Sequence, residues 1–486
     1  MPKLSPLQIR AFEGIVGQKN VLNRPEELIA YECEAALLFK AVPDLVIIPQ
    51  SAKEVLDVVQ LCRKYRIPYI ARGAGTGLSG GSIPTQGGVL ISLAALSQIL
   101  EIDPINRTAT VEAGVLNGQL NEALKSHDLF YAPDPSSQSA CTIGGNIAEN
   151  AGGIHCLKYG VTVDHVQAVE IVTPEGELIW IGDKHGQTPG PQWLSLIIGS
   201  EGTFGIVTKA ILKLTPQPQR TKVFLAAFNA LLQATGCVSK IIESDIEPAA
   251  LEFMDAFTTQ SVNQAFDIGL PHDATAILII ELDGTPMMVE HGQKKLHQYL
   301  KQFKACEIQE AEDEYERKRL WMCRKLAVAS YGQYYPSFYL HDCVIPRGQL
   351  TTVLEKIIAI GKQHDVLIGN VFHAGDGNLH PNILFDPKDQ AMLQRALSAG
   401  EEILQVCLDA GGVLSGEHGV GLEKQAYMTR QFNPETLQMM ADLKSVFDPD
   451  NLCNPGKIIP HRQTCGEARA KAATHLEDNP RIEVTR

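Results

Sequence analysis

Residues 42–215 alternate between short apolar runs and longer amphipathic segments. Leu45–Ile48 has the length and composition of a buried strand. Ser51 and Glu54 have the spacing of a capping box, and the apolar positions of Val55–Cys62 repeat behind them at helical intervals. This part of the chain therefore predicts an α/β unit in which a helix follows a strand.

The same region contains further strand patterns, and one pair of them predicts a hairpin. The predicted strands are Ile67–Ala71, Val89–Leu93, Arg107–Ala113, Val166–Val172 and Glu177–Ile181. The last two strands flank Pro174–Gly176, whose residues favour a turn. The predicted arrangement is therefore mixed and not a pure βαβ repeat.

A change in composition near Pro218 predicts a domain boundary. Residues 217–222 are polar and contain proline, and beyond them strand-like segments alternate with longer helices such as Gln349–His364 and Asp389–Cys407. We expect an N-terminal helical segment at 1–37, a first domain at 38–217, a second domain at 218–459 and a loose charged tail at 460–486.

Composition narrows the class of protein. The 486 residues carry a formal charge of −14 without a long basic run, which disfavours nucleic acid and anionic membranes as partners. No apolar run approaches the roughly 18 residues that span a membrane, and Met1–Glu13 has no readable secretory signal, so we expect a cytoplasmic protein. The eleven cysteines contain no CxxC pair, which argues against iron–sulfur and four-cysteine zinc sites. Any electrons that the protein handles would need another carrier.

Arg72–Gly81 is one of the densest glycine stretches of the chain and follows the predicted strand Ile67–Ala71 directly. Within it, Gly75–Gly80 has the GxGxxG pattern of a dinucleotide fingerprint. That fingerprint requires a helix at the loop, whereas here Pro84 and two more glycines lead into another strand. The sequence therefore favours a nest of backbone amides that binds a diphosphate without a helix. The alternative is a tight structural turn.

Two later blocks are also rich in small residues. Pro133–Gly153 combines hydroxyls, amides and paired glycines, and Ile198–Val207 ends by entering a strand. Each block alone could be an ordinary loop. Three such blocks within one α/β segment favour a shared, extended ligand over three unrelated turns.

The second half of the chain offers a candidate metal site. His373 and His380 lie on either side of a glycine-rich turn, and Ser415–Gly419 contributes Glu417 and the imidazole of His418. Two histidines and a glutamate are suitable ligands for Zn²⁺ or a similar divalent ion, and they leave positions open for substrate oxygens. The alternative is a set of hydrogen-bonded histidines in ordinary loops.

Arg324 and Lys325, just after Trp321, are a weaker signal. A charged pair is usually a solvated surface feature. A carboxylate substrate, however, is best bound by a planar guanidinium, which makes an arginine a candidate clamp.

Nearly the whole chain resembles a known family of flavoproteins. Pro43 to Thr215 resembles the FAD-binding domain of the vanillyl-alcohol oxidase or p-cresol methylhydroxylase (PCMH) type, and the rest to Lys457 resembles the FAD-linked oxidase C-terminal domain. The matching stretches are Tyr31–Glu34, Arg72–Gly81, Pro133–Gly153, Gly199–Gly205, Trp321–Lys325, His373–Pro381, Gly416–Gly419 and Phe447–Lys457. The family includes the D subunits of glycolate oxidase, which are the most similar branch, and the D-lactate and D-2-hydroxyglutarate dehydrogenases.

The resemblance implies a fold of the α+β class and a set of cofactor contacts. A vanillyl-alcohol-oxidase/PCMH-type FAD-binding domain would be followed by an FAD-linked oxidase C-terminal α/β cap domain. FAD would be noncovalent, because the loop at 72–81 lacks the histidine that tethers flavin in some relatives. In the loop that binds the diphosphate, the cofactor contacts would be Arg72, Gly73, Ala74, Gly75, Thr76, Gly77 and Gly80. The residues that line the flavin would be Pro133, Asp134, Ser137, Thr142, Gly144, Gly145 and Gly153, with Ile206 on its far side. Glu34 departs from the family, in which aspartate is more common at this position.

The resemblance also implies a reaction, the oxidation of a small 2-hydroxy acid to the 2-oxo acid by hydride transfer to the flavin. Glycolate is the expected substrate, and D-lactate and D-2-hydroxyglutarate stay open. His373, His380 and Glu417 would bind a divalent metal, expected to be zinc. His418 would be the general base, Arg324 the carboxylate clamp and Asn382 a substrate contact.

Two alternative functions stay open, and the resemblance also implies partner subunits. A metal-dependent hydrolase would leave the glycine-rich blocks unused, and a noncatalytic flavin-binding scaffold subunit would not need the base, clamp and metal positions. Electrons from the flavin would pass to a flavin-binding E-type subunit and an Fe–S-bearing F-type subunit of a glycolate oxidase complex, or directly to O₂. Those subunits would provide any attachment to the inner membrane.

Overall fold

The computed structural model describes residues 4–36, 38–186, 190–460, 481 and 483–484. Contacts divide the chain into two units. The first unit comprises Met1–Gly153, Gly160–Pro216 and Glu417–Thr485, and the second comprises Ile154–Tyr159 and Gln217–Gly416. The second domain expected from the sequence, 218–459, is thus divided, because its last part belongs to the first unit. Most of the expected tail at 460–486 lies outside the described residues.

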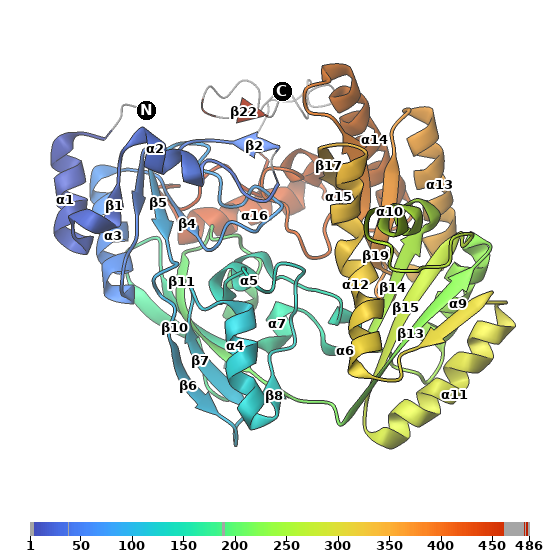
Figure 1. The fold of residues 1–486 in the computed structure, drawn as a ribbon. Coiled ribbons are helices and arrows are strands. Elements are labelled where there is room, and N and C mark those ends of the chain that lie inside the picture. Colours follow the sequence, from blue (N-terminus) through green and yellow to red (C-terminus); the bar gives the residue numbers. More distant parts are fainter. Residues whose placement is uncertain (1–3, 37, 187–189, 461–480, 482, 485–486) are drawn as a thin grey trace. The chain divides into compact units, whose positions relative to one another are not determined.

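A small sheet near the N-terminus forms the first layer of the first unit (Figure 1). Its strands, in spatial order, are β1 (Val21–Leu22), β3 (Leu45–Ile47), β5 (Val89–Ser92) and β4 (Tyr69–Arg72). The last three are parallel, and β1 is antiparallel to β3. α1 (Pro6–Val16) and α3 (Ala52–Tyr65) share an apolar core with this sheet. As predicted, the Ser51 hydroxyl caps α3 by accepting from the amide of Glu54.

The predicted hairpin belongs to a second, antiparallel sheet of the first unit. Its strands, in spatial order, are β10 (Leu178–Gly182), β9 (Val166–Val172), β11 (Ile206–Lys213), β7 (Thr108–Glu112) and β6 (Ile99–Asp103). β9 and β10 are antiparallel neighbours, which confirms the hairpin. α4 (Asn117–Leu124) and α5 (Ile143–Glu149) bury their apolar faces in the core of this sheet.

Short elements complete the first unit. They are α2 (Pro25–Leu28), β2 (Phe39–Lys40) with its partner β22 (Glu483–Val484), β8 (Leu129–Phe130) with its partner β12 (Thr215–Pro216), α7 (Thr162–His165), α8 (Trp193–Ile197), α15 (Met428–Gln431) and α16 (Pro434–Phe447).

The second unit is built on one large sheet whose strand pairs are antiparallel (Figure 1). Its main path is β16 (Glu307–Glu310), β13 (Arg220–Phe228), β15 (Ala276–Gly284), β14 (Ala250–Asp255), β19 (Ile368–His373), β20 (Asn378–Leu379) and β18 (Cys343–Val344). β21 (Pro381–Phe385) pairs with β19 and with β17 (Ser337–Leu340).

Helices and sheet form a common core in the second unit. α10 (Ala256–Phe266) and α12 (Glu314–Ser330) pack on β13, β14, β15 and β19 through one apolar cluster. The remaining helices are α6 (Cys156–Tyr159), α9 (Leu231–Glu243), α11 (Pro286–Gln302), α13 (Leu350–Gln363) and α14 (Gln390–Asp409). α13 and α14 lie where the sequence predicts long helices. None of the helices that the structure describes has the length and apolar character needed to cross a membrane.

Candidate active site

The glycine loop of the first unit exposes its backbone. It connects the parallel neighbours β4 and β5 without a helix, in agreement with the rejection of a Rossmann fingerprint. Gly75 and Gly80 have φ values of +71° and +78°, a region that disfavours residues with a Cβ. Gly73, Gly75, Thr76 and Gly77 are partly exposed, and Ala74 is exposed. The loop therefore presents amides to a ligand with little side-chain cover.

Two buried charged side chains hold this loop in place. Arg72 donates to the carbonyl oxygen of Cys33 at 2.7 Å and to the hydroxyl of Ser82 at 3.2 Å, and burial lowers its pKa. The Glu34 carboxylate accepts from the amides of Gly80, at 3.0 Å, and Ser82. Glu34, the departure from the family pattern, thus supports the glycine loop, and a direct cofactor contact from Arg72 stays a prediction.

The second small-residue block meets the first. The Thr142 hydroxyl accepts from the amide of Gly145 at 3.2 Å and so caps α5. A Cβ at Gly73 would lie 2.4 Å from that same hydroxyl oxygen, so only glycine fits there. At the other end of the block, a Cβ at Gly153 would lie 2.4 Å from the carbonyl oxygen of Asp134. Residues of both predicted blocks therefore converge, as a shared ligand would require.

The remaining predicted flavin contacts differ in their surroundings. Pro133 is buried, and Ser137 and Gly144 are partly buried in the same block. Ile206, the first residue of β11, is 1% exposed and its side chain belongs to the apolar core. A flavin contact of the Ile206 side chain would therefore compete with its packing, and all these contacts stay predictions.

The third block contributes a buried carboxylate. Glu201 is 5% exposed and accepts from the amides of Val420 at 2.8 Å and Gly421 at 3.0 Å. Burial raises its pKa to about 7, and the nearby charge of Glu34 acts in the same direction. Burial and the charge of Glu201 raise the pKa of Glu149 well above its ordinary value. The carboxyl group of Glu201 is therefore partly protonated near neutral pH.

Asn454 and Lys457 form hydrogen bonds with the same region of the first unit. The Asn454 side-chain amide donates to the carbonyl oxygens of Gly81 at 2.9 Å and Glu201 at 2.7 Å. Lys457 is 4% exposed and donates to the carbonyl oxygen of Ile83 at 2.6 Å. The first unit thus combines sparsely covered backbone amides with rigid support beneath them. This combination suits the diphosphate and ring system of FAD.

In the second unit, a carboxylate joins two predicted site residues. The register pairs Glu252 of β14 with His373 of β19, so their side chains lie next to each other on the sheet. One Glu252 oxygen lies 2.6 Å from Nδ1 of His373, and the other accepts from Nε of Arg324 at 2.6 Å. Glu252 is fully buried. Burial alone would raise its pKa, but His373 and Arg324 outweigh that effect and hold the pKa below its ordinary value.

The predicted pair Arg324–Lys325 separates into two environments. Arg324 is 8% exposed, whereas Lys325 is exposed. Among the described residues, Glu252 is the one acceptor that the Arg324 guanidinium contacts. The solvated-surface interpretation therefore applies to Lys325 and not to Arg324.

The two histidines of the predicted metal site lie together. The rings of His373 and His380 have centroids 4.9 Å apart, and both residues are buried. A ring nitrogen of each lies within 4.8 Å of a ring nitrogen of the other, near enough for both imidazoles to face one divalent ion. The histidine pair therefore fits a divalent metal.

A second buried carboxylate, Asp342, lies beside this pair. Its Oδ1 is 3.5 Å from Nε2 of His380, and its Oδ2 accepts from the Ser415 hydroxyl at 2.6 Å and from the Gly416 amide at 2.9 Å. Glu417 and His418 follow Gly416 directly in the chain but are grouped with the first unit, and both are partly buried. Their roles as third ligand and base stay predictions.

Asn382 has a structural contact. It is fully buried, and its side-chain amide donates to the carbonyl oxygen of His380 at 2.8 Å. It thereby fixes the backbone of a predicted metal ligand. Its contact with substrate stays a prediction.

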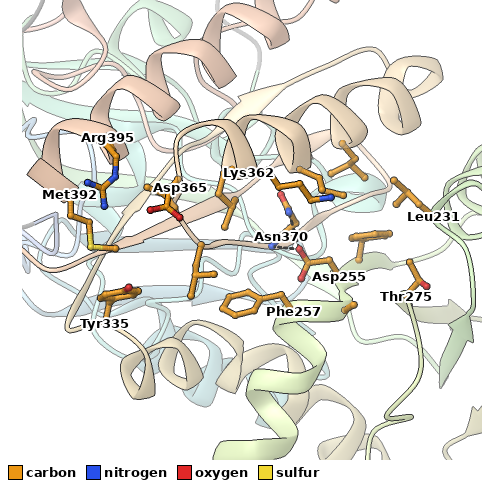
Figure 2. Close-up of a pocket in the computed structure, with 18 residues that line it drawn as sticks. Leu231, Asp255, Phe257, Thr275, Tyr335, Lys362, Asp365, Asn370, Met392 and Arg395 are labelled. Carbon is orange, nitrogen blue, oxygen red and sulfur yellow. Dashed lines mark hydrogen bonds between the residues drawn. The ribbon is translucent and has the colours of Figure 1, made fainter.

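A separate cavity of about 730 Å³ in the second unit contains none of the predicted site residues (Figure 2). It lies beside Ile368 and Asn370 at the start of β19, whereas His373 ends that strand. Apolar residues dominate its walls, and its charged residues are two acids and two bases: Asp255, Asp365, Lys362 and Arg395. A small carboxylate would find neither net positive charge nor a close fit there, so we assign no chemistry to it.

Comparison with known proteins identifies the family. Residues 217–458 match the C-terminal domain of FAD linked oxidases, and residues 43–182 match an FAD binding domain. The chain is 42% identical over 455 residues to glycolate oxidase subunit GlcD of Escherichia coli (strain K12), covering 94% of this chain and 91% of that protein. The chain belongs to the FAD-linked oxidase family. A D-lactate dehydrogenase of Anaerostipes hadrus is 30% identical over 467 residues, with 94% and 98% of the two chains covered.

A solved structure supports the fold of this FAD-linked oxidase. p-Cresol methylhydroxylase with bound substrate matches with a TM-score of 0.78 over 93% of this chain and 96% of that chain, at 16% identity. At such low identity the likeness concerns the fold alone. It confirms the predicted α+β class, a PCMH-type FAD-binding domain combined with an FAD-linked oxidase C-terminal domain.

Proposed function

We propose that this FAD-linked oxidase converts a small 2-hydroxy acid, in the first place glycolate, to the 2-oxo acid. Its similarity to a glycolate oxidase subunit and to a D-lactate dehydrogenase supports this substrate class. The higher identity to the former favours glycolate. The observation that carries the proposal is the buried group of Arg324, Glu252 and His373. A buried guanidinium suits an anionic acid, and an imidazole fixed beside it suits the metal that would activate the hydroxyl group of that acid.

FAD bound to the first unit supplies an acceptor for two electrons and for the hydrogen of the substrate's α-carbon. The protein binds the cofactor through the amides of the loop at Gly73–Gly77, while Arg72 and Glu34 hold the loop in place, the latter through the Gly80 amide. Because these supports are buried, the loop needs little reorganisation when the diphosphate binds.

Arg324 binds the substrate carboxylate. With Nε donating to Glu252, the two terminal nitrogens of the guanidinium still offer donors that can form a bidentate pair with a second carboxylate. A bidentate pair fixes the position and the orientation of a small acid. Lysine at this position would supply charge without that geometry.

His418 removes the hydroxyl proton. An imidazole is suited to this role because its ordinary pKa lies near neutral pH. His373, His380 and Glu417 would hold a divalent metal, expected to be zinc, which when bound lowers the pKa of a coordinated hydroxyl group. Asn382 holds the backbone of His380 and contacts the substrate.

The protein acts as one subunit of a complex. Its relative in Escherichia coli is named as a subunit, and this chain has no CxxC pair for an iron–sulfur relay. Flavin-binding E-type and Fe–S-bearing F-type subunits would then accept the electrons and attach this cytoplasmic chain to the inner membrane. Rapid oxygen uptake by the isolated protein would contradict this route and favour direct reaction with O₂.

The decisive experiment is anaerobic addition of hydroxy acids to the purified protein. We expect yellow protein whose flavin absorbance is bleached fastest by glycolate and more slowly by D-lactate or D-2-hydroxyglutarate. Treatment with a chelator should abolish bleaching, and Zn²⁺ should restore it. Colourless protein would favour a hydrolase, and yellow protein that no hydroxy acid bleaches would favour a noncatalytic scaffold subunit.

A further inference from the structure

The proposed reaction uses Arg324 and His373, but the residue that holds both of them is Glu252. Its carboxylate lies between the guanidinium and the imidazole, with both contacts at 2.6 Å. The side chain is fully buried, so no solvent competes for either contact. The three residues come from β14, α12 and β19, and Glu252 links these elements at one point.

We propose that Glu252 is a positioning residue that couples the carboxylate clamp to the metal site, an inference that rests on the proposed function. An ionised carboxylate only accepts hydrogen bonds, so the Nδ1 of His373 that faces it must carry the hydrogen. Nε2 then carries the lone pair, which is the nitrogen form that a metal binds. Glu252 thus selects the tautomer of one metal ligand and the orientation of the clamp at the same time.

The chemistry of the two contacts explains why only a carboxylate serves here. Nε of Arg324 and Nδ1 of His373 are both donors, and Glu252 offers an acceptor oxygen to each. Glutamine has one acceptor oxygen and one amide group that donates. Glu252→Gln must therefore place a donor against a donor, or reverse the tautomer of His373 so that Nε2 carries the hydrogen.

The second unit provides a matched control in Glu281. This buried carboxylate lies on the neighbouring strand β15 and also has one histidine and one nitrogen donor as partners, His155 at 3.3 Å and Nε1 of Trp321 at 2.7 Å. Glu281 contacts neither Arg324 nor His373 among the interactions described. Glu281→Gln thus reproduces the loss of a buried negative charge without the proposed coupling.

The test compares wild type, Glu252→Gln, Glu252→Asp and Glu281→Gln as full-length holoproteins. Their Zn²⁺ affinities are measured by titration with the metal alone, and their kcat and KM for glycolate by dye reduction. We expect Glu252→Gln to bind Zn²⁺ roughly 10–100-fold more weakly, because residues behind a metal ligand typically have effects of that size. Its KM should also rise, while flavin content stays unchanged. Glu252→Asp, which keeps both acceptors, should recover part of both losses.

The outcomes separate this inference from the proposed function. If Glu252→Gln matches Glu281→Gln in Zn²⁺ affinity and KM, the coupling role is wrong even when wild type oxidises glycolate. If wild type oxidises no hydroxy acid, the proposed function is wrong, and the Zn²⁺ titration still decides whether Glu252 positions His373. A wild-type protein that binds no Zn²⁺ would overturn both the metal site and this role of Glu252.

Discussion

The two units build their candidate sites from different atoms. In the first unit the proposed ligand-binding surface is backbone, chiefly from Gly73 to Gly77, with buried side chains such as Arg72 and Glu34 supporting the loop. In the second unit the proposed functional atoms belong to the side chains of Arg324, Glu252 and His373, which are placed by strand register and by helix α12. A backbone site is sensitive to added side-chain volume, and a side-chain site is sensitive to changes in charge and hydrogen bonding.

The largest expected loss of flavin tests the backbone side of this comparison. In Gly75→Ala, the new Cβ would lie 2.1 Å from the Arg72 guanidinium, in a residue whose φ of +71° already disfavours alanine. We expect at least about tenfold weaker flavin binding, since each 1.4 kcal/mol is worth a factor of ten, and activity should fall with it. The ratio of flavin to protein absorbance measures this.

Gly14→Ala is the matched control in the same unit. Gly14 lies in α1, and apart from the backbone of that helix a Cβ added there would meet no described atom within 4 Å. This variant should keep its flavin. Full flavin occupancy in Gly75→Ala would show that the loop tolerates a side chain, and the backbone interpretation of the first site would fail.

His418→Ala tests whether loss of a functional side chain leaves the cofactor in place. We expect kcat to fall about 10²–10⁴-fold, the usual contribution of a general base, with flavin content unchanged. Steady-state kinetics with glycolate and the flavin spectrum together measure the two quantities. His272→Ala, at an exposed histidine of the second unit, is the control. Undiminished turnover in His418→Ala would remove this residue from the mechanism.

Arg324→Lys asks whether geometry matters beyond charge in the second unit. Lysine keeps the positive charge but lacks the planar fork, so we expect KM for glycolate to rise about 10–100-fold with a smaller change in kcat. Lys325→Gln, at the exposed neighbour, should change neither constant. Equal kinetics in Arg324→Lys and wild type would mean that a point charge is sufficient to bind the substrate.

The smallest effect concerns the buried acids of the first unit. The pKa of Glu201 is raised from 4.5 to about 7, chiefly by burial, with Glu34, Glu149 and Lys457 nearby. Between pH 4.5 and about 7 the unfolded chain has lost this proton while the folded chain keeps it. The free energy of unfolding therefore falls as the pH rises through that window.

Glu201→Gln removes this titration and keeps an oxygen for the amides of Val420 and Gly421. We expect Tm of the wild type to fall more than Tm of the variant between pH 5 and 7, by about 2–4 °C for each kcal/mol involved. Calorimetry at both pH values measures the difference. Parallel Tm values would show that Glu201 is ionised throughout the window.

The difference between the backbone site of the first unit and the side-chain site of the second also explains which features could be predicted from the sequence. The hairpin of β9 and β10 and the glycine loop after β4 were predictable, because turn residues and a φ that favours glycine are local signals. Glu252 was missed because its partners are 72 and 121 residues away, and the strand register that aligns it with His373 depends on tertiary packing. The available signal was a carboxylate within the otherwise apolar stretch Leu251–Met254.

The boundary predicted near Pro218 lies close to the change of unit at Pro216, but the return of residues 417–459 to the first unit was beyond local patterns. Nothing in the composition of residues 417–459 distinguishes them from the segment before them, yet they belong to the first unit. Their contacts with the first unit, such as the hydrogen bond from Asn454 to Gly81, join residues far apart in the sequence and leave no periodic pattern.

The contacts of Asn454 and Lys457 also bear on the order in which the two units are completed during synthesis. Both residues follow the whole second unit in the chain and donate to the carbonyl oxygens of Gly81 and Ile83, beside a loop made hundreds of residues earlier. A nascent chain can complete its second unit while the first still lacks this final closure. The glycine loop would then gain its full support only after the second unit has been synthesised.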